Sequence, residues 1–155
     1  MSARLCAAVA TLAVALPTVG VADAQARFVV NRSMEGVAIG MSSGEVRERL
    51  GEPVSREAGP DFATWHFHRP PIEVTLKPDV VTLHTTSETV RGPRSIGVGT
   101  RERRLRAVLG RRVRCTTTVE QRLCIVGSFR MGRRSTVFEM ARRQVTAVTI
   151  SRSVD

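Results

Sequence analysis

Two segments of the chain are alike: IGMSSGEVRERLG at 39–51 and VGTRERRLRAVLG at 98–110. In each, an apolar residue and a glycine precede a short amphipathic stretch that closes on Leu-Gly. Val46 and Leu50 are four residues apart, as are Leu105 and Leu109, so each stretch presents one apolar face of a helix. The repetition predicts two copies of one structural unit.

Both segments also contain signals for the start and end of the helix. Ser42 and Glu45 have the spacing of a capping box, in which each side chain accepts a hydrogen bond from the backbone N–H of the other residue. Thr100 is the nearest cap candidate in the second segment. Gly51 and Gly110 follow the last apolar residues, where a helix often ends in a left-handed conformation. We therefore expect one short helix in each segment.

Three strand-like segments follow each predicted helix. Apolar and polar residues alternate in them, so that Trp65 and Phe67 share a core-facing side. The segments span 63–68, 72–76 and 80–85 in the first half, and 123–129, 135–140 and 144–151 in the second. The sequence thus predicts an α+β fold of two tandem repeats, each a short helical segment followed by a three-stranded antiparallel β-meander. Packing of both copies would give a domain-sized core.

The first 26 residues have the pattern of a secretory signal peptide. Arg4 supplies a positive start, 5–16 form an apolar run, and 24–26 offer small residues at the cleavage position. The alternative is an uncleaved anchor, but the run is shorter than the ~20 residues that a membrane-spanning helix needs. We expect a signal peptide at 1–26, a first repeat at 27–90 and a second, Arg-rich repeat at 91–155. The predicted protein is secreted or located in the periplasm or cell envelope, is monomeric, and has no transmembrane segment after signal cleavage.

Two cysteines remain outside the predicted signal peptide, Cys115 and Cys124. In an exported protein such a pair most simply forms a disulfide. The alternative is a metal pair, which Cys-x8-Cys supports poorly because no second ligand pair stands at zinc spacing. We therefore predict a disulfide in the second repeat.

Basic residues are concentrated in the second half of the chain. Residues 27–90 contain seven basic and nine acidic side chains, net −2, whereas 91–155 contain 16 basic and four acidic ones, net +12. A dense positive surface attracts polyanions and acidic partners. The alternative is an ordinary solvated helix face in an Arg-rich proteome. The candidate basic surface consists of Arg101, Arg103, Arg104, Arg106, Arg111 and Arg112.

Specific nucleic-acid recognition is disfavoured. Five Phe, one Trp and no Tyr are too few aromatic side chains for a base-stacking platform, and the sequence has no base-reading motif. A protein or an anionic polymer of the envelope is the more plausible partner of the basic surface.

A second candidate surface surrounds WHFHRPP at 65–71. If the aromatic side chains face the core, His66 and His68 face outward, and Glu73 and His84 occupy outward positions on the next two segments. These four residues are candidate sheet-face binding residues for a protein. A transition-metal site of His66, His68 and Glu73 is an alternative, but solvent-facing histidines are the simpler interpretation, so no metal or other cofactor is predicted.

The sequence lacks recognisable catalytic patterns. It has no Gly-x-Ser-x-Gly nucleophile elbow, and GVGT at 97–100 lacks the further glycine and the lysine of a phosphate-binding loop. Ser42 and Ser43 are explained as helix caps, and the cysteines as a disulfide. No catalytic residue is therefore predicted, and the protein is expected not to be an enzyme.

The pattern Ile-Gly-Met-Ser-x-x-Glu-Val-x-x-x-Leu-Gly-x-Pro at 39–53 resembles the signature of the SmpA/OmlA, or BamE-like, envelope domains. A tandem pair of such units is also similar to the β-lactamase inhibitory protein fold, whose concave sheet face binds a partner enzyme. The resemblance implies helix-plus-sheet repeats over the whole mature chain. BamE-like proteins are typically single-copy lipoproteins, whereas this chain shows two copies and no lipidation cysteine.

Together these observations predict a secreted, non-enzymatic binding protein of the cell envelope or extracellular space. It would engage a protein or polyanionic partner through the sheet face, the basic surface or both. Two alternatives are an envelope-assembly scaffold of the BamE-like type and a metal-binding protein that uses surface histidines.

Overall fold

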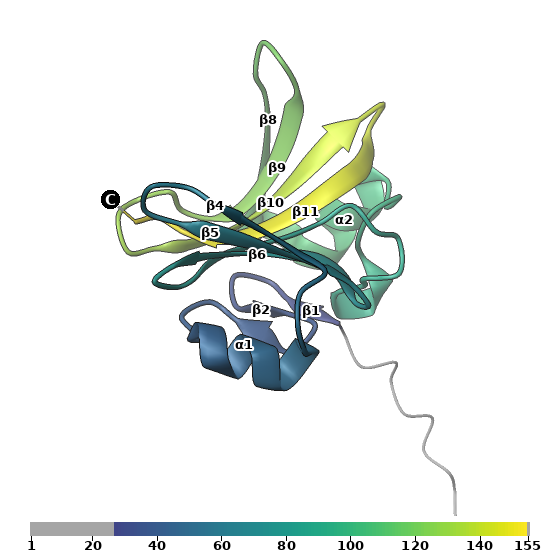
Figure 1. Cartoon of the computed structure of the whole chain (residues 1–155). Coiled ribbons are helices and arrows are strands. Elements are labelled where there is room, and N and C mark those ends of the chain that lie inside the picture. The colour runs from purple at the N-terminus through teal and green to yellow at the C-terminus, as the bar shows by residue number, and fades with distance from the viewer. Residues whose placement is uncertain (1–26, 155) are drawn as a thin grey trace, which may run out of the picture.

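A computed structural model describes residues 27–154, and the predicted signal peptide lies outside this range. One large antiparallel sheet crosses the molecule, with small elements packed against it (Figure 1). In chain order the elements are β1 (Phe28–Val29), β2 (Ser33–Met34), β3 (Val37–Ala38), α1 (Ser43–Leu50), β4 (Ser55–Ala58), β5 (Ala63–His68), β6 (Pro71–Lys77), β7 (Asp79–Thr85), the 3-10 helix η1 (Pro93–Ser95), α2 (Glu102–Leu109), the 3-10 helix η2 (Gly110–Arg112), β8 (Val113–Thr117), β9 (Arg122–Gly127), β10 (Arg134–Ala141) and β11 (Gln144–Arg152).

The large sheet has eight strands in the order β4-β5-β6-β7-β11-β10-β9-β8. Neighbours in the chain are neighbours in the sheet, except where β7 pairs with β11 and places Leu83 opposite Ile150. This pairing joins strands from both halves of the sequence. The predicted α+β fold of two repeats, each a helix and a three-stranded meander, is therefore wrong: the described chain is mostly β and is built on one continuous sheet.

The strands absent from the prediction are short or lie at the edges of the sheet. All four residues of β4 are exposed, and four of the five residues of β8 are exposed or only partly buried. An edge strand without a buried side has no apolar–polar alternation to reveal it. β1, β2 and β3 have two residues each and form a separate three-stranded sheet, too short for any periodicity.

Helix α1 begins with the predicted capping box. Ser42 Oγ accepts a hydrogen bond from the Glu45 N–H at 3.4 Å, and Glu45 Oε2 accepts one from the Ser42 N–H at 2.7 Å. Two otherwise unpaired N–H groups are thereby satisfied. Gly51 ends the helix with φ of 80°, and Val46 is fully buried.

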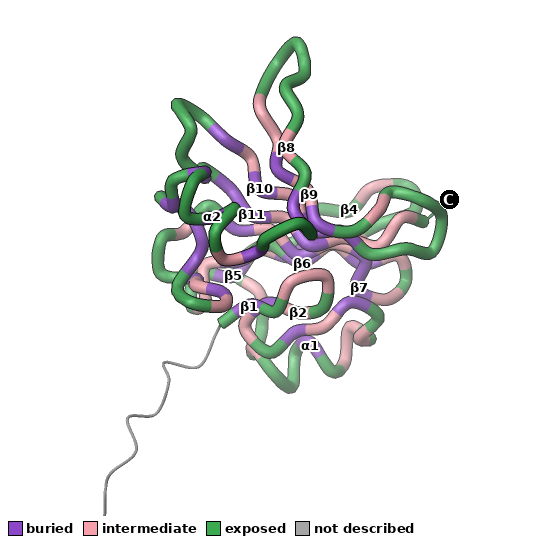
Figure 2. The backbone as a smooth tube through the Cα atoms, turned by 180° about the vertical axis from the view of Figure 1, so that it is seen from behind, coloured by how far each residue is buried: buried purple, intermediate pink, exposed green. Residues whose placement is uncertain are grey.

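The core lies between one face of the large sheet and the layer that contains the helices and β1–β3. Phe28 of β1 packs on Phe138 of β10 with ring centroids 6.3 Å apart, while Val46 and Leu105 enter the same cluster from the two helices. Figure 2 shows that buried residues follow the strands and these facing elements, whereas the turns of the β8–β9 and β10–β11 hairpins are exposed.

The opposite face of the large sheet is lined mainly by polar side chains. His66 lies opposite Glu73, Glu73 opposite His84, and His84 opposite Thr149, so one row crosses four strands. No helix within residues 27–154 has the length and apolar character needed to cross a membrane.

Candidate functional site

The start of α2 is bound to the β10–β11 hairpin by backbone hydrogen bonds. The Gly99 N–H donates to the Val145 carbonyl at 2.7 Å, and the Val145 N–H donates to the Thr100 carbonyl at 3.0 Å. The first helical N–H, that of Glu102, donates to the Arg143 carbonyl at 2.9 Å. A helix start normally leaves such N–H groups without a partner. Here the hairpin supplies one, which fixes the hairpin tip beside the helix.

The tip of this hairpin consists of two arginines in an unusual backbone conformation. Arg142 and Arg143 have φ of 49° and 62°, and they connect the paired residues Ala141 and Gln144. Positive φ at both central residues is the pattern of a type I′ turn, for which Asn-Gly is preferred. A side chain with a Cβ in this region costs roughly 1–2 kcal/mol. Two arginines are thus held at a position where other residues would be more stable.

Helix α2 and the hairpin enclose an open cleft of about 850 Å³. We call it the basic cleft, and its lining residues are Arg101, Glu102, Arg103, Arg106, Arg142, Arg143 and Gln144. Arg106 is paired with Glu102. Within residues 27–154, the side chains of Arg101, Arg103, Arg142 and Arg143 have no hydrogen-bond or ion-pair partner. Four guanidinium groups are therefore available to an anion.

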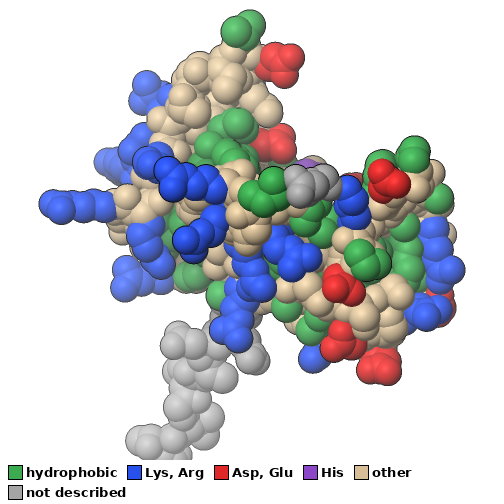
Figure 3. All heavy atoms as spheres, turned by 90° about the vertical axis from the view of Figure 1, so that its left-hand side faces the viewer, with side chains coloured by type: hydrophobic (Ala, Val, Ile, Leu, Met, Phe, Trp, Pro, Cys, Tyr) green, Lys and Arg blue, Asp and Glu red, His purple; other side chains and the backbone are tan. Residues whose placement is uncertain are grey.

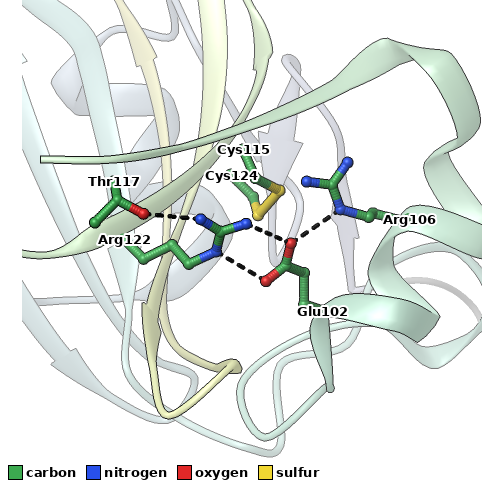
Figure 4. The surroundings of a disulfide bond; sticks show 6 residues. All are labelled: Glu102, Arg106, Cys115, Thr117, Arg122 and Cys124. Carbon is green, nitrogen blue, oxygen red and sulfur yellow. Dashed lines mark hydrogen bonds and ion pairs between the residues drawn. A yellow bond between two sulfur atoms is a disulfide. The ribbon is translucent and has the colours of Figure 1, made fainter.

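Glu102 links the basic cleft to the β8–β9 hairpin (Figure 4). Its Oε1 accepts from Arg106 Nε at 2.9 Å and from Arg122 Nη2 at 2.8 Å, and its Oε2 accepts from Arg122 Nε at 2.9 Å. Arg122 also donates to Thr117 Oγ1 at 2.8 Å. The two hydrogen bonds from Arg122, and then the one from Arg106, lower the pKa of Glu102 from 4.5 to about 2. Charge-assisted, bidentate pairing of this kind is strong and directional.

This pairing predicts an acid-sensitive contribution to stability. Because the folded pKa of Glu102 lies below its ordinary value, the contribution is complete above pH 4.5 and is lost as the pH falls toward 2. Glu102→Gln should lower the free energy of unfolding at neutral pH by about 1–2 kcal/mol and flatten its pH dependence in that window. Urea unfolding over this pH range measures both effects. Glu120→Gln, an exposed carboxylate in the β8–β9 loop, is the control, and an equal effect there would contradict the assignment.

The disulfide lies next to this network. Cys115 of β8 and Cys124 of β9 are directly opposite in the register and are joined by a disulfide bond. Cys124 is fully buried. The bond ties the edge strand β8 to β9, and Arg122, which holds Glu102, lies two residues before Cys124. The disulfide therefore constrains the strand that carries Arg122, the partner of the cleft residue Glu102.

The structure divides the six arginines of the sequence-predicted basic surface. Arg101, Arg103 and Arg106 line the basic cleft. Arg104 donates instead to the Arg94 carbonyl at 3.1 Å, and two lie exposed in η2, Arg111 and Arg112.

Arg142 and Arg143 are additional lining residues that the sequence analysis missed. Their only local signal is that they separate two strand-like segments. A turn without glycine or asparagine gives little indication of a tight hairpin, and none of its proximity to a helix about 40 residues earlier in the chain.

The structure brings the four sheet-face residues of the sequence prediction to one region of the sheet. His66 Nδ1 lies 3.6 Å from Glu73 Oε1, and His66 Nε2 lies 3.4 Å from Glu57 Oε1. His84 Nδ1 is 2.9 Å from Thr149 Oγ1. His66, His68, Glu73 and His84 all line a pocket of about 430 Å³. The face offers imidazole, hydroxyl and carboxylate groups, in contrast to the arginines of the basic cleft.

The donors of a possible metal site do not converge on this face. Within residues 27–154, three metal-ligating side chains approach within 4.8 Å of one another only at Glu102, Cys115 and Cys124. There the sulfurs are joined in the disulfide and the carboxylate is bonded to arginines. His66, His68 and Glu73 form no such set, so the geometry does not favour the metal-binding alternative.

No protein-family model matches this sequence, and no curated protein matches it. Among solved structures, an extracellular protein containing an SCP domain from Bacillus anthracis is similar in fold, with a TM-score of 0.53 and 12% identity over 74% of this chain and 44% of that chain. A cysteine-rich secretory protein from Staphylococcus aureus gives 0.48 and 10% over 74% and 44%. A DUF4309 family protein from Bacillus subtilis gives 0.47 and 15% over 77% and 84%. This chain therefore spans less than half the length of the first two proteins.

These comparisons overturn the resemblance to SmpA/OmlA (BamE-like) domains and to β-lactamase inhibitory proteins. No family model matches the sequence, the described residues form one continuous eight-stranded sheet, and the similar structure with a TM-score of 0.53 contains an SCP domain. The motif at 39–53 encodes a capped turn and one short helix. Such a local element can precede sheets of different topology, so the motif did not determine the fold.

Proposed function

We propose that this protein is a secreted, non-enzymatic binding protein whose basic cleft binds a polyanionic partner in the cell envelope or extracellular space. The observation that carries the proposal is the placement of Arg142 and Arg143. They occupy a costly backbone conformation, and hydrogen bonds to the start of α2 hold them opposite Arg101 and Arg103. Strain that the surrounding structure maintains is common at ligand-binding sites.

The electrostatics of the basic cleft favour an anionic ligand. Five arginines and one glutamate line it, and the glutamate is already paired with Arg106 and Arg122. The remaining guanidinium groups repel one another, and a bound anion would relieve this repulsion. Planar guanidinium groups match phosphate and carboxylate oxygens in a bidentate geometry. The rigid frame reduces the ordering cost of binding.

An extended polyanion fits better than a single small ion. The cleft is open and its volume of about 850 Å³ falls in the upper part of the range for sites that hold a whole drug-sized ligand. The exposed Arg104, Arg111 and Arg112 lie on or just after the same helix, so positive charge continues beyond the cleft. A polymer with repeating charges could contact both regions.

Two further observations support a binding protein outside the cytoplasm. The sequence begins with a signal-peptide pattern, and the protein with a TM-score of 0.53 is described as extracellular. The only carboxylate of the basic cleft is held ionised by arginines, which leaves it poorly suited to act as a general base near neutral pH. Binding is therefore a better interpretation of this site than catalysis.

Calorimetric titration with linear polyphosphate tests the proposal. Arg103→Gln should weaken binding about tenfold, since a hydrogen bond to a charged group contributes about 1.5–3 kcal/mol. The slope of log K against log salt should fall by about one. Arg49→Gln removes the same charge from an exposed position on α1, which contributes no residue to the cleft, and is the matched control. Equal affinity of both variants, or no binding by the natural protein to either polyphosphate or poly-glutamate, would contradict the proposal.

A further inference from the structure

A loop at the other end of the large sheet presents apolar side chains among arginines. We call residues 128–133, between β9 and β10, the β9–β10 loop. Phe129 and Met131 are 56% and 64% exposed. Arg130 and Arg133 alternate with them and are also exposed, and Arg134 follows at the start of β10. Large exposed apolar side chains are costly on a surface that faces only water, and a group of them marks an interaction site.

The shape of the β9–β10 loop is fixed by hydrogen bonds. The Arg133 N–H donates to the Arg130 carbonyl at 2.9 Å, and the Arg130 N–H donates to Ser128 Oγ at 3.2 Å. The residues after β11 hold its other side, because the Gly132 N–H donates to the Ser153 carbonyl and the Ser153 N–H donates to the Arg133 carbonyl. The exposure of Phe129 and Met131 is therefore a feature of an ordered turn.

Apolar and cationic surfaces adjoin each other under the β9–β10 loop. A pocket of about 510 Å³ is lined by Ile125, Phe129 and the Cys115 side of the disulfide, and a second of about 740 Å³ by Arg133 and Arg134. Arg114 and Arg130 line both pockets. None of the described residues that line either pocket is acidic. Figure 3, which views this end of the molecule, shows Lys and Arg side chains around hydrophobic ones, with most Asp and Glu over the other half.

We propose that the β9–β10 loop docks the protein on an anionic phospholipid surface. Phe129 and Met131 would enter the boundary between headgroups and acyl chains, while Arg130 and Arg133, whose side chains have no partner within residues 27–154, contact the phosphates. Interfacial binding depends on this combination of buried apolar area and attraction to anionic lipid. Two apolar side chains on a projecting turn offer too little area for a stable protein interface, which typically needs about 800 Å² per partner.

This site is independent of the basic cleft. It uses other residues, and it lies at the opposite ends of β10 and β11 from Arg142 and Arg143. A negative result for vesicle binding would therefore not contradict the proposed polyanion binding, and a negative result for polyphosphate binding would not contradict the proposed lipid binding.

Vesicle co-sedimentation tests the proposal with phosphatidylcholine alone and with phosphatidylcholine mixed with phosphatidylglycerol. The natural protein should bind only the mixed vesicles. Arg130→Gln/Arg133→Gln should lower the partition coefficient roughly 30-fold, about fivefold for each charge. Phe129→Ser/Met131→Ser should lower it at least tenfold. Arg47→Gln/Arg49→Gln, two exposed positions on α1 that line neither pocket, gives the same net charge as the first variant and should bind nearly as the natural protein does.

A fluorescent reporter tests insertion directly. The chain has one tryptophan, Trp65, which is 9% exposed. Phe129→Trp should show a blue shift and quenching by brominated lipid, whereas Val119→Trp, at the exposed tip of the β8–β9 hairpin, should show neither. The proposal is overturned if the natural protein does not bind mixed vesicles, if the α1 control loses as much binding as the loop variant, or if both reporters behave alike. A different result would assign the loop to an acidic protein partner. In that case the natural protein would not bind vesicles, and the loop variants would bind poly-glutamate more weakly than the natural protein does.

Discussion

Replacing Arg142 and Arg143 with Asn and Gly should stabilise the protein and disable its basic cleft. Asn-Gly is the preferred pair for a type I′ turn, so the substitution should remove the conformational cost of two arginines with positive φ and raise the free energy of unfolding by about 1–2 kcal/mol. Affinity for linear polyphosphate should fall on the order of 100-fold, since two charge-assisted contacts are lost. Urea unfolding and calorimetry measure the two changes.

Arg142→Gln/Arg143→Gln separates the two causes. It removes both charges but keeps side chains with a Cβ in the strained turn, so it should lose the same affinity without gaining stability. If the Asn-Gly variant binds polyphosphate as well as the natural protein does, the hairpin arginines are not part of the binding site. If it is less stable than the natural protein, the interpretation of the turn as strained is wrong.

Removing the disulfide should have the largest effect on stability. Cys115 and Cys124 are nine residues apart, and closing a loop of this length is worth about 2–3 kcal/mol in the chain-entropy model. Cys115→Ala/Cys124→Ala should lower the free energy of unfolding by that amount. Cleft binding should weaken as well, because Arg122 on β9 holds Glu102, one of the residues that line the cleft.

Unfolding with and without a reducing agent checks this prediction. The reducing agent should destabilise the natural protein to the level of the double variant and leave the double variant unchanged. Loss of stability in the variant with no response of the natural protein to reduction would assign the effect to lost packing of the buried Cys124 rather than to the cross-link.

The local elements were predictable from the sequence because each has a strong local signal. The Ser42–Glu45 capping box places α1, and period-2 alternation locates β5, whose bounds of 63–68 agree with the prediction. The way in which the sheet is assembled has no such signal. The pairing of β7 with β11 depends on contacts between residues more than 60 positions apart, and the alternation of either strand is the same whether or not they pair.

The candidate site was predictable to a similar extent. Arg101, Arg103 and Arg106 were identified from the charge density around one helix. Which of the neighbouring arginines face the cleft is decided by the β10–β11 hairpin, whose tip reaches the helix start only in the folded chain. Arg104 and Arg111 belong to the same basic stretch of the sequence but do not line the cleft.

The seam between β7 and β11 also sets the order in which this protein can fold. β7 has no sheet partner on one side until residues 144–152 have been made and have folded back. Before then an unpaired strand edge is exposed in the middle of the future sheet, and such edges are templates for aggregation. Because distant strands join late, the seam should close last. A chaperone that shields β7 during synthesis would protect the step at which this chain is most vulnerable.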